Sequence, residues 1–438
     1  MSSRSSAVAA FSHGEDPRTG RRRRRRVALV ASASGYRLGD FLDAARALRL
    51  EVVLATDAAP PAPTLGPHRV LTVDLSRIDE AAAAIARTEP EAIVPVEDVG
   101  VRVAAAAAAL LGLPANPPEA AAAARDKLLA RRRLAAGGIH QPEFLPVPPG
   151  GLGAVAARLG GPIVVKPRRL SGGRGVLRLE TAADADVVEE RIRRIVADEG
   201  GDPTEDLVAE RYVPGPELAV EGVLRRGELE VLATIDVPDA SSGPTFEETF
   251  LIAPSRLPDA ALDAAIATLS DAVAALGLVE GPIHAELRLA ETPMILEIAA
   301  RPIGGRCGRA FRFGLLGESL ETTLLRAALD LPGPAASLVG AAGIFMVPVA
   351  RPGRFVGLRN LEAALAVPGV TEIEVAVPPG RRVRPLPEDG RYLGFVFAAG
   401  DDPAFVEEAL RTAASLLEVE IHERAEGADP GPAPSAPT

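Results

Sequence analysis

Two glutamates of this 438-residue chain, Glu286 and Glu297, have side chains that could bind a metal ion together. Both are expected on neighbouring strands of one hairpin, where facing residues have Cβ atoms roughly 4.5–5.5 Å apart. Two carboxylates at that separation repel each other unless a cation lies between them. Magnesium takes carboxylate oxygens and completes its coordination with phosphate oxygens and water. The pair therefore indicates either a metal–phosphate site or, as the alternative, a solvated polar face.

The hairpin itself follows from the pattern of apolar residues. Residues 283–289 alternate between apolar and polar side chains, which is typical of a strand with one buried face. Residues 290–293 have the composition of a turn, and residues 294–298 are apolar apart from the second glutamate. If the turn is symmetric, Leu289 pairs with Met294, and the same register places the two glutamates opposite each other.

Arg301 is the third residue that this segment contributes to a candidate site. It lies four residues after Glu297 and shortly before the glycine pair Gly304 and Gly305. A guanidinium keeps its charge and offers a planar fork that suits phosphate or carboxylate. The alternative is an ion pair with a surface acid, worth about 0–1 kcal/mol. Because two acids precede it and flexible glycines follow it, we interpret Arg301 as a catalytic candidate.

A glycine-rich loop at residues 171–175, Ser-Gly-Gly-Arg-Gly, is the second candidate region. It follows an apolar strand that ends in Lys166. The loop lacks the G-x-x-x-x-G-K spacing of a P-loop. Backbone N–H groups of glycine-rich turns can still face a phosphate, and a lysine adds a point charge. A flexible hairpin without a ligand is the alternative meaning of such a loop.

Composition restricts the classes of protein that fit. The net charge of −11 disfavours a nucleic-acid partner for the body of the protein. The run Arg21–Arg26 is expected to be a flanking charge run, with contact to an anionic partner as the alternative. The single cysteine, Cys307, excludes a disulfide within the chain, and no apolar run is long enough to span a bilayer. We expect a cytoplasmic protein without a membrane partner.

The N-terminal part alternates strands and helices, which predicts a doubly wound α/β fold with a parallel sheet. Its predicted strands are residues 27–31, 51–55, 68–73 and 92–96. Glu97 and Asp98 follow the last strand, at an edge where α/β folds bind ligands. We interpret them as loop or helix-cap residues. A proline break at residues 116–118 starts one helix that runs through Leu134 and carries Lys127.

These features stand in one order along the chain: Lys127, Lys166, the glycine-rich loop, Glu210 seven residues before Glu217, and the glutamate hairpin. Each is a weak signal alone, but the ordered series resembles the ATP-grasp superfamily. The segments HAE at residues 284–286 and LEIAAR at residues 296–301 are similar to those of L-amino-acid ligases, which join two amino acids. The resemblance covers residues 28–423, counting the last folded segment.

The resemblance implies how the triphosphate and the metal would be held. Lys127 and Lys166 would contact the ATP phosphates, and Glu286 and Glu297 would be the magnesium ligands. Arg301 would steady the γ-phosphate and the reacting centre. A mobile loop would close over the phosphates, and its residues are Ser171, Gly172, Gly173 and Gly175.

The resemblance also implies the place of the nucleoside. Glu210 would lie near the adenine amino group, with backbone hydrogen bonds to adenine from Tyr212 and Val213. Glu217 would hold the ribose hydroxyls. One departure concerns Ala299, which stands where many ATP-grasp enzymes have an asparagine metal ligand. The amino-acid ligase branch lacks that asparagine too, so the departure favours this branch and leaves open whether one or two magnesium ions are held.

The resemblance further implies a multidomain α/β and α+β architecture. A Rossmann-like N-terminal domain would precede a central ATP-grasp fold of two α+β subdomains and a small C-terminal α+β domain, between two disordered tails. The expected boundaries are residues 1–26 for the basic tail, 27–118, 119–330 and 335–424 for the three domains, and 425–438 for the last tail.

The expected activity is that of an ATP- and magnesium-dependent carboxylate–amine ligase, with Mn²⁺ as an alternative metal. It would form an amide or peptide bond through an acylphosphate and release ADP and phosphate. The substrates would be a small-molecule carboxylate, such as an amino acid, and an amine. The alternatives are another ATP-grasp ligase of the purine-biosynthesis or carboxylase type, and a non-catalytic nucleotide-binding sensor. Whether the chain acts as a homodimer is left open by the sequence.

Overall fold

The fold is taken from a computed structural model, which describes residues 24–33, 35–58, 68–315, 317–333 and 337–422. The predicted tails, residues 1–26 and 425–438, fall outside these ranges except for the last three arginines of the first tail. Within the described part of the chain, no helix combines the length and the apolar character that crossing a bilayer requires.

The end of the predicted basic tail belongs to the folded part, so this prediction was wrong there. Arg26 is already the first residue of strand β1 (Arg26–Val30). Arg25 forms an ion pair of 2.7 Å with Glu91, and Arg26 forms one of 2.9 Å with Glu51. The arginines are ordered because acids at the starts of the neighbouring strands neutralise them.

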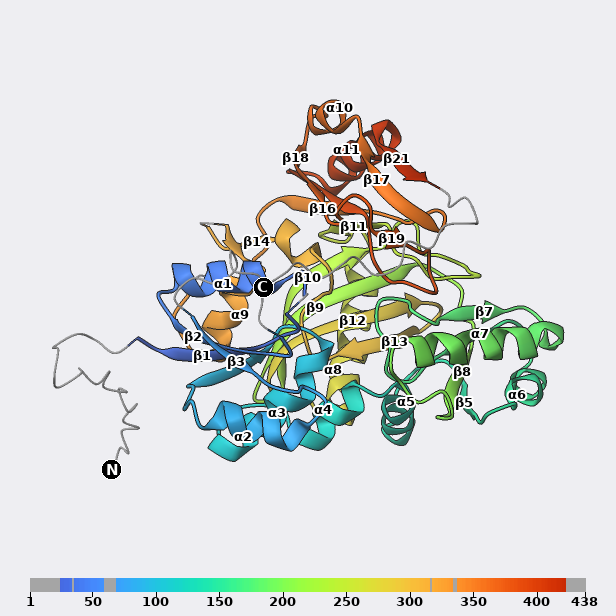
Figure 1. The fold of residues 1–438 in the computed structure, drawn as a ribbon, viewed down its shortest axis with the longest axis horizontal. Coiled ribbons are helices and arrows are strands. Elements are labelled where there is room, and N and C mark those ends of the chain that lie inside the picture. Colours follow the sequence, from blue (N-terminus) through green and yellow to red (C-terminus); the bar gives the residue numbers. More distant parts are fainter. Residues whose placement is uncertain (1–23, 34, 59–67, 316, 334–336, 423–438) are drawn as a thin grey trace, which may run out of the picture.

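The first sheet is parallel, with the strand order β3-β2-β1-β4 (Figure 1). Besides β1, its strands are β2 (Glu51–Thr56), β3 (Arg69–Thr72) and β4 (Ala92–Pro95). The helices that cover it are α1 (Leu38–Ala47), α2 (Ile78–Ala86), α3 (Val101–Leu111) and α9 (Leu320–Ala328). Val27 and Leu29 face α1 and α9, whereas Ala28 and Val30 face α2 and α3. The predicted doubly wound parallel sheet is therefore confirmed.

The single helix predicted after the proline break is two helices, α4 (Pro118–Ala124) and α5 (Lys127–Ala136). The side chain of Asp126 accepts hydrogen bonds of 3.1 Å from the backbone N–H groups of Leu128 and Leu129. An aspartate in that position caps a new helix N-terminus, so the alanine-rich run is interrupted here. Lys127 consequently stands at the first position of α5.

The second sheet is antiparallel, with the order β5-β8-β6-β7. Its strands are β5 (Phe144–Val147), β6 (Ile163–Lys166), β7 (Leu177–Leu179) and β8 (Leu207–Arg211). The helices α6 (Leu152–Leu159) and α7 (Ala185–Asp198), preceded by the short η3 (Ala182–Asp184), share its core. The glycine-rich loop joins β6 to β7, as the strand–loop–strand pattern predicted.

The third sheet has eight strands in the order β13-β12-β9-β10-β11-β16-β20-β18. Its first strands are β9 (Glu217–Arg225), β10 (Glu228–Asp236), β11 (Phe250–Ala253), β12 (Gly281–Leu289) and β13 (Pro293–Ala299). Helix α8 (Asp259–Leu276) packs its apolar side chains against β9 and β12. The sheet thus carries both halves of the predicted glutamate hairpin.

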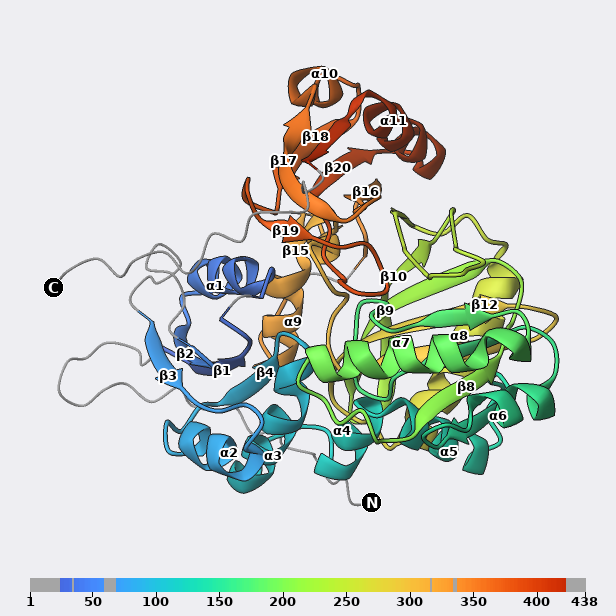
Figure 2. The same ribbon diagram turned by 45° about the vertical axis from the view of Figure 1, so that its right-hand side comes forward.

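The last segment of the chain continues this sheet, as Figure 2 shows. Strand β16 (Ala341–Val347) pairs with β11, and it is followed in the sheet by β20 (Gly394–Gly400) and β18 (Val370–Val375). The remaining elements are β14 (Arg312–Phe313), β15 (Glu318–Ser319), β17 (Gly353–Arg359), β19 (Arg382–Val383), β21 (Glu418–His422), α10 (Leu361–Leu365), α11 (Pro403–Leu416), η2 (Asp98–Gly100) and η4 (Cys307–Ala310). The α+β composition predicted for this segment is present, and the domain boundaries stay a prediction.

The hairpin of β12 and β13 has the predicted glutamate pair but not the predicted turn. Leu289 pairs with Pro293 rather than with Met294, which shifts the register by one residue near the turn. A β-bulge then inserts an extra residue in β13, and beyond it Glu286 lies opposite Glu297. A bulge re-aims side chains and is often found beside functional sites.

Candidate functional site

The predicted site residues come together around one cavity of about 170 Å³. Its walls come from the antiparallel four-stranded sheet, from β9, β12 and β13 of the eight-stranded sheet, and from the glycine-rich loop. The predicted residues that line it are Lys127, Lys166, Ser171, Gly172, Gly173, Glu210, Tyr212, Val213, Glu217, Glu286, Glu297 and Arg301. Gly175, the remaining predicted residue, is not among the lining residues; a Cβ added to it would lie 3.0 Å from the ring of Pro167. Predicted site residues that are far apart in the sequence, such as Lys127 and Arg301, are therefore assembled into one pocket.

Glu210 is fully occupied by two cations in the wall of this cavity. Its carboxylate accepts a hydrogen bond of 2.7 Å from Nε of Arg131 and forms an ion pair of 2.9 Å with Nζ of Lys166. Burial alone would raise the pKa of Glu210, but Arg131 and Lys166 outweigh it and lower the pKa to about 2. Sequence reasoning missed Arg131, which lies on α5 and gave no signal beyond its charge.

Lys127 links the loop to the hairpin. Its Nζ donates a hydrogen bond of 2.9 Å to the carbonyl oxygen of Leu170 and one of 3.1 Å to Oε1 of Glu297. The amine therefore stands between the base of the glycine-rich loop and one of the two predicted metal ligands. A phosphate entering here would meet a lysine that is already positioned.

Three carboxylates lie close together at the centre of the cavity. Oxygens of Glu217, Glu248 and Glu286 lie within 4.8 Å of one another. Burial raises the pKa of Glu217 to about 7, assisted by the charge of Glu286 and opposed by Arg288. The pKa of Glu248 is raised well above its usual value by burial and then by the same two acids. Oxygen ligands gathered in this way suit a hard divalent cation.

The structure thus brings Glu286, but not Glu297, into this three-carboxylate group. Glu297 faces Glu286 in the ladder while its carboxylate is bound by Lys127. Glu248 lies between β10 and β11, outside both predicted strands of the hairpin, and sequence reasoning missed it. The signal that could have found it is a pair of acids, Glu247 and Glu248, directly before the apolar strand β11.

His284 lies two residues before Glu286 on β12 and contacts its carboxylate. Its Nδ1 lies 3.2 Å from Glu221, and its Nε2 lies 3.6 Å from Glu286. Burial would lower the pKa of His284, but hydrogen bonds to Glu221 and Glu286 outweigh it and raise the pKa to about 9. The resulting imidazolium, together with Lys166 and Arg301, lowers the pKa of Glu286 despite its burial. Glu286 is therefore a carboxylate at neutral pH.

Arg301 is paired with Asp98 of the N-terminal part. Its Nε lies 3.2 Å from Oδ2 of Asp98, and Arg125 contacts Oδ1 of the same carboxylate at 2.8 Å. Burial opposes ionisation of Asp98, but the two arginines hold its pKa well below its usual range. The interpretation of Asp98 as a simple loop or cap residue was wrong, because its side chain reaches across to the hairpin rather than to its own helix.

The glycine-rich loop packs against the last segment of the chain. Gly172, Gly173 and Gly175 have φ values of 65°, 70° and 70°, which side chains rarely adopt. The backbone N–H of Gly175 donates a hydrogen bond of 3.0 Å to the carbonyl oxygen of Pro387. A Cβ at Gly173 would lie 3.1 Å from the side chain of Leu386. The loop geometry therefore requires glycine at these positions.

The predicted adenine region includes the backbone of Tyr212 and Val213. The backbone N–H of Tyr212 donates a hydrogen bond of 2.9 Å to the carbonyl oxygen of Pro162. The predicted backbone hydrogen bonds to adenine stay a prediction, in which Tyr212 would contribute its carbonyl oxygen. The guanidinium of Arg178 lies 4.1 Å from the centre of the Tyr212 ring, which fixes this wall of the cavity.

Two segments of the chain match known family models. Residues 159–310 match the ATP-grasp domain. Residues 345–422 match domain 2 of the L-amino acid ligase C-terminal region. The chain carries an ATP-grasp domain followed by an L-amino acid ligase C-terminal domain. The predicted family is confirmed, and the ATP-grasp match contains every predicted site residue except Lys127.

Solved structures resemble this ATP-grasp chain over nearly its whole length. An L-amino acid ligase from Bacillus licheniformis is 26% identical, with a TM-score of 0.74 over 92% of this chain and 100% of that one. A carboxyaminoimidazole ribonucleotide synthase from Aspergillus clavatus, crystallised with ATP, is 21% identical, with a TM-score of 0.70 over 90% of this chain and 98% of that one. At that identity the second likeness shows the fold alone.

A curated relative adds no activity of its own. The uncharacterized protein y4rH of Sinorhizobium fredii is 26% identical over 327 residues, which is 70% of this chain. The match spans 64% of the relative's length. The ATP-grasp fold is thus established by the family model and the structures, and the substrates are left to the chemistry of the site.

Proposed function

We propose that this protein is an ATP-dependent carboxylate–amine ligase that joins an amino acid or a similar small acid to an amine. The observation that carries the proposal is the joint placement of Lys127, Lys166, Arg301 and the three-carboxylate group around one cavity. Binding of adenine alone needs neither a buried acid group nor Arg301. The resemblance to the Bacillus licheniformis L-amino acid ligase supports the amino-acid substrate class.

The residues fit a bound magnesium ion, because oxygens of three acids lie within 4.8 Å of one another and carboxylate oxygens are ligands that this ion takes. Glu217, Glu248 and Glu286 would hold it, and Glu297 would join them if Lys127 turned to phosphate. When bound, the ion would neutralise charge on the transferring phosphoryl group. The sequence resemblance assigned Glu217 to the ribose hydroxyls instead. In the structure its carboxylate forms an ion pair of 2.6 Å with Arg288.

The reaction would have two steps. A carboxylate oxygen of the acid attacks the γ-phosphorus of ATP, the bond to ADP breaks, and an acylphosphate forms. The amine nitrogen then attacks the acyl carbon, phosphate leaves with the bonding electrons, and the nitrogen loses a proton. Positioning and charge neutralisation supply most of the acceleration in such phosphoryl transfers.

The chain's own residues would serve these steps in distinct ways. Lys127 and Lys166 would bind phosphate oxygens, and the glycine-rich loop would exclude water that otherwise hydrolyses the acylphosphate. Arg301, anchored by Asp98, would face the oxygens that gain charge.

The test is ADP release measured over a panel of amino-acid pairs with ATP and magnesium. Glu286→Gln should abolish ADP release while the circular dichroism spectrum stays unchanged, because it removes a charge that faces the metal and the phosphates. Glu291→Gln, on the exposed turn of the same hairpin, is the matched control and should keep full activity. Normal turnover in Glu286→Gln would reject the assigned site.

The same assay separates the alternatives. ADP release that requires bicarbonate in place of an amino acid would indicate a ligase of the carboxylase type. ATP binding by calorimetry without ADP release under any condition would indicate a nucleotide sensor. Release of ADP with hydroxylamine as the amine, together with a hydroxamate of the acid, would demonstrate the acylphosphate.

A further inference from the structure

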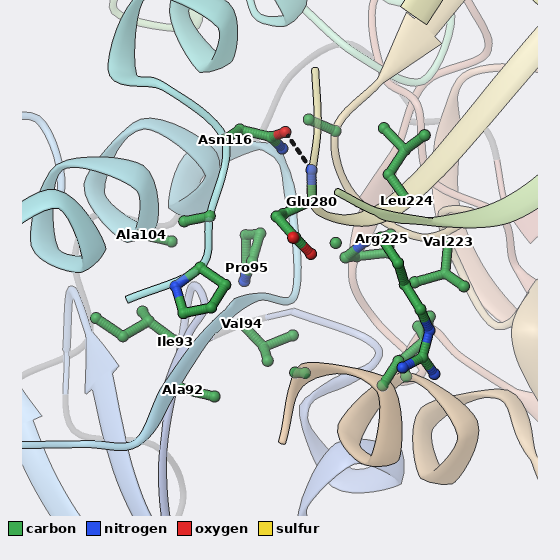
Figure 3. A pocket seen from close by; sticks show the side chains of 18 of the residues that line it. Ala92, Ile93, Val94, Pro95, Ala104, Asn116, Val223, Leu224, Arg225 and Glu280 are labelled. Carbon is green, nitrogen blue, oxygen red and sulfur yellow. Dashed lines mark hydrogen bonds between the residues drawn. The ribbon is translucent and has the colours of Figure 1, made fainter. Parts of the chain in front are cut away.

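A second and larger cavity lies between the first sheet and the ends of strands β9 and β12 (Figure 3). Its volume is about 510 Å³, and it shares no lining residue with the candidate active site among the described residues. It lies where β4 and α3 of the first sheet meet the ends of β9 and β12 and the last turn of α9. Cavities of 300–1,000 Å³ with a few polar groups are typical ligand sites.

The walls of this cavity are apolar and built from short side chains. Figure 3 shows Ile93, Val94 and Ala104 on one side and Val223 and Leu224 on the other. Ala105, Ala121, Ala300, Ala327 and Ala328 also line the space. The alanines leave unfilled volume that larger side chains would occupy, so an apolar group of a ligand can enter it without displacing the core.

Charged groups stand at the edge of the apolar space. Glu280 extends its carboxylate toward the gap between Pro95 and Arg225 (Figure 3). The Glu280 side chain accepts a hydrogen bond of 3.0 Å from the backbone N–H of Arg226, which fixes its direction. Across the ranges that the structure describes, neither the carboxylate of Glu280 nor the guanidinium of Arg226 takes part in an ion pair. Glu228 also lines the cavity without an ion pair among the described residues, so Arg226 and either acid can face the two charges of a ligand.

Asn116 fixes this arrangement from the other side. Its Oδ1 accepts hydrogen bonds of 2.7 Å from the backbone N–H of Val279 and 3.0 Å from that of Glu280. The side chain of Asn116 is therefore oriented by the two residues that precede β12. Backbone contacts thus hold Asn116 and Glu280, whereas Arg225 and Asp330, which also line the cavity, form an ion pair of 3.8 Å with each other.

We propose that this cavity binds a zwitterion with an apolar side chain, namely an apolar amino acid or a short apolar peptide, at a site separate from the catalytic one. Glu280 takes the ammonium group, Arg226 takes the carboxylate, and the alanine-rich wall takes the side chain. An apolar acid could pair only with Arg226, and an apolar amine only with Glu280, whereas a zwitterion pairs with both. The proposal concerns binding alone, so it does not depend on the ligase activity.

The test uses methyl NMR of the full chain with labelled alanine methyl groups, titrated with L-leucine and with L-leucyl-L-leucine. Methyl resonances of Ala104 and Ala327 should shift in a saturable manner with at least one of the two ligands, and the stronger ligand identifies the source. 4-Methylpentanoate lacks the ammonium group of leucine, and isopentylamine lacks its carboxylate. Each should bind roughly tenfold or more weakly than leucine and should shift the same resonances much less at equal concentration.

Two variants make the test specific. Glu280→Gln keeps an oxygen for the backbone N–H of Arg226 but removes the charge, and it should weaken leucine binding by roughly tenfold or more. Ala327→Phe fills the cavity and should abolish the shift at Ala104. Glu362→Gln, on exposed α10, is the matched control and should bind as the unmodified chain does.

Two outcomes would overturn the proposal. The first is no saturable shift at Ala104 or Ala327 with either ligand at millimolar concentration. The second is equal affinity in the unmodified chain and in Glu280→Gln. Glu286→Gln, which should lack ADP release, should retain this binding, so failure of the ligase proposal and failure of the second site are separately visible.

Discussion

Replacing Glu210 with glutamine should change how the stability of the protein depends on pH. The carboxylate is 2% exposed and lies 2.7 Å from Nε of Arg131 and 2.9 Å from Nζ of Lys166. A neutral amide would leave two buried cations without a counter-charge. Removing one partner of such a buried pair typically costs about 3–5 kcal/mol at neutral pH.

The pH-dependent part of this cost follows from the pKa of Glu210. The folded protein lowers this pKa from 4.5 to about 2. Because the folded pKa is depressed, the stabilisation is fully present above pH 4.5 and is lost as the pH falls toward 2. Each pKa unit corresponds to about 1.4 kcal/mol, so about 2 kcal/mol should be lost between pH 4.5 and about pH 3.

Urea unfolding followed by circular dichroism measures the effect, since the chain has no tryptophan for fluorescence. The difference in unfolding free energy between the unmodified chain and Glu210→Gln should shrink by about 2 kcal/mol from pH 7 to about pH 3. Glu362→Gln, at an exposed position, should show no such convergence. If the difference stays constant with pH, the Arg131–Glu210–Lys166 interaction does not exist as described.

Three further variants test the neighbouring parts of the site. Asp98→Asn should lower turnover by about tenfold or more while ATP affinity measured by calorimetry is nearly unchanged, because Arg301 loses its ion-pair partner. Unchanged turnover would show that Asp98 is not needed for the role of Arg301. Gly173→Ala should cost roughly 1–2 kcal/mol in the loop conformation and reduce turnover more than global stability, and a fully active variant would contradict a closing role. Glu248→Gln should raise the magnesium concentration needed for half-maximal ADP release, because it removes a proposed metal ligand, and an unchanged magnesium requirement would remove Glu248 from the metal site.

The features predicted correctly from the sequence are those encoded by local pattern. The strand periodicities of the first sheet and of the glutamate hairpin depend on neighbouring residues. The pairing of Glu286 with Glu297 was also predicted correctly, although the turn is one residue shorter than expected and a bulge restores the register. A bulge cannot be placed from apolar alternation, because the extra residue, Leu296, is itself apolar.

The features that were missed depend on partners distant in the chain. Asp98 acquires its role only when the first sheet meets the hairpin, and Arg131 only when α5 packs beside β8. Glu248 lies outside any regular pattern, and its proximity to Glu286 arises from the arrangement of β9, β11 and β12. The pairing of β16 with β11, through which the predicted C-terminal segment extends the central sheet, likewise joins strands that are distant in the chain.

The ion pairs of the cavity explain why a nucleotide would have to bring its own cation. Each basic side chain that lines the cavity near the hairpin is already paired with an acid: Lys127 with Glu297, Lys166 with Glu210, Arg288 with Glu217, and Arg301 with Asp98. A bare triphosphate would add negative charge beside the ionised Glu286 and beside Glu217 and Glu248, whose pKa values burial and neighbouring acids already raise. A divalent cation held by these acids would reverse that balance, because its charge offsets theirs and attracts the phosphate oxygens. ATP binding should therefore be cooperative with magnesium, with each raising the affinity for the other by the same factor.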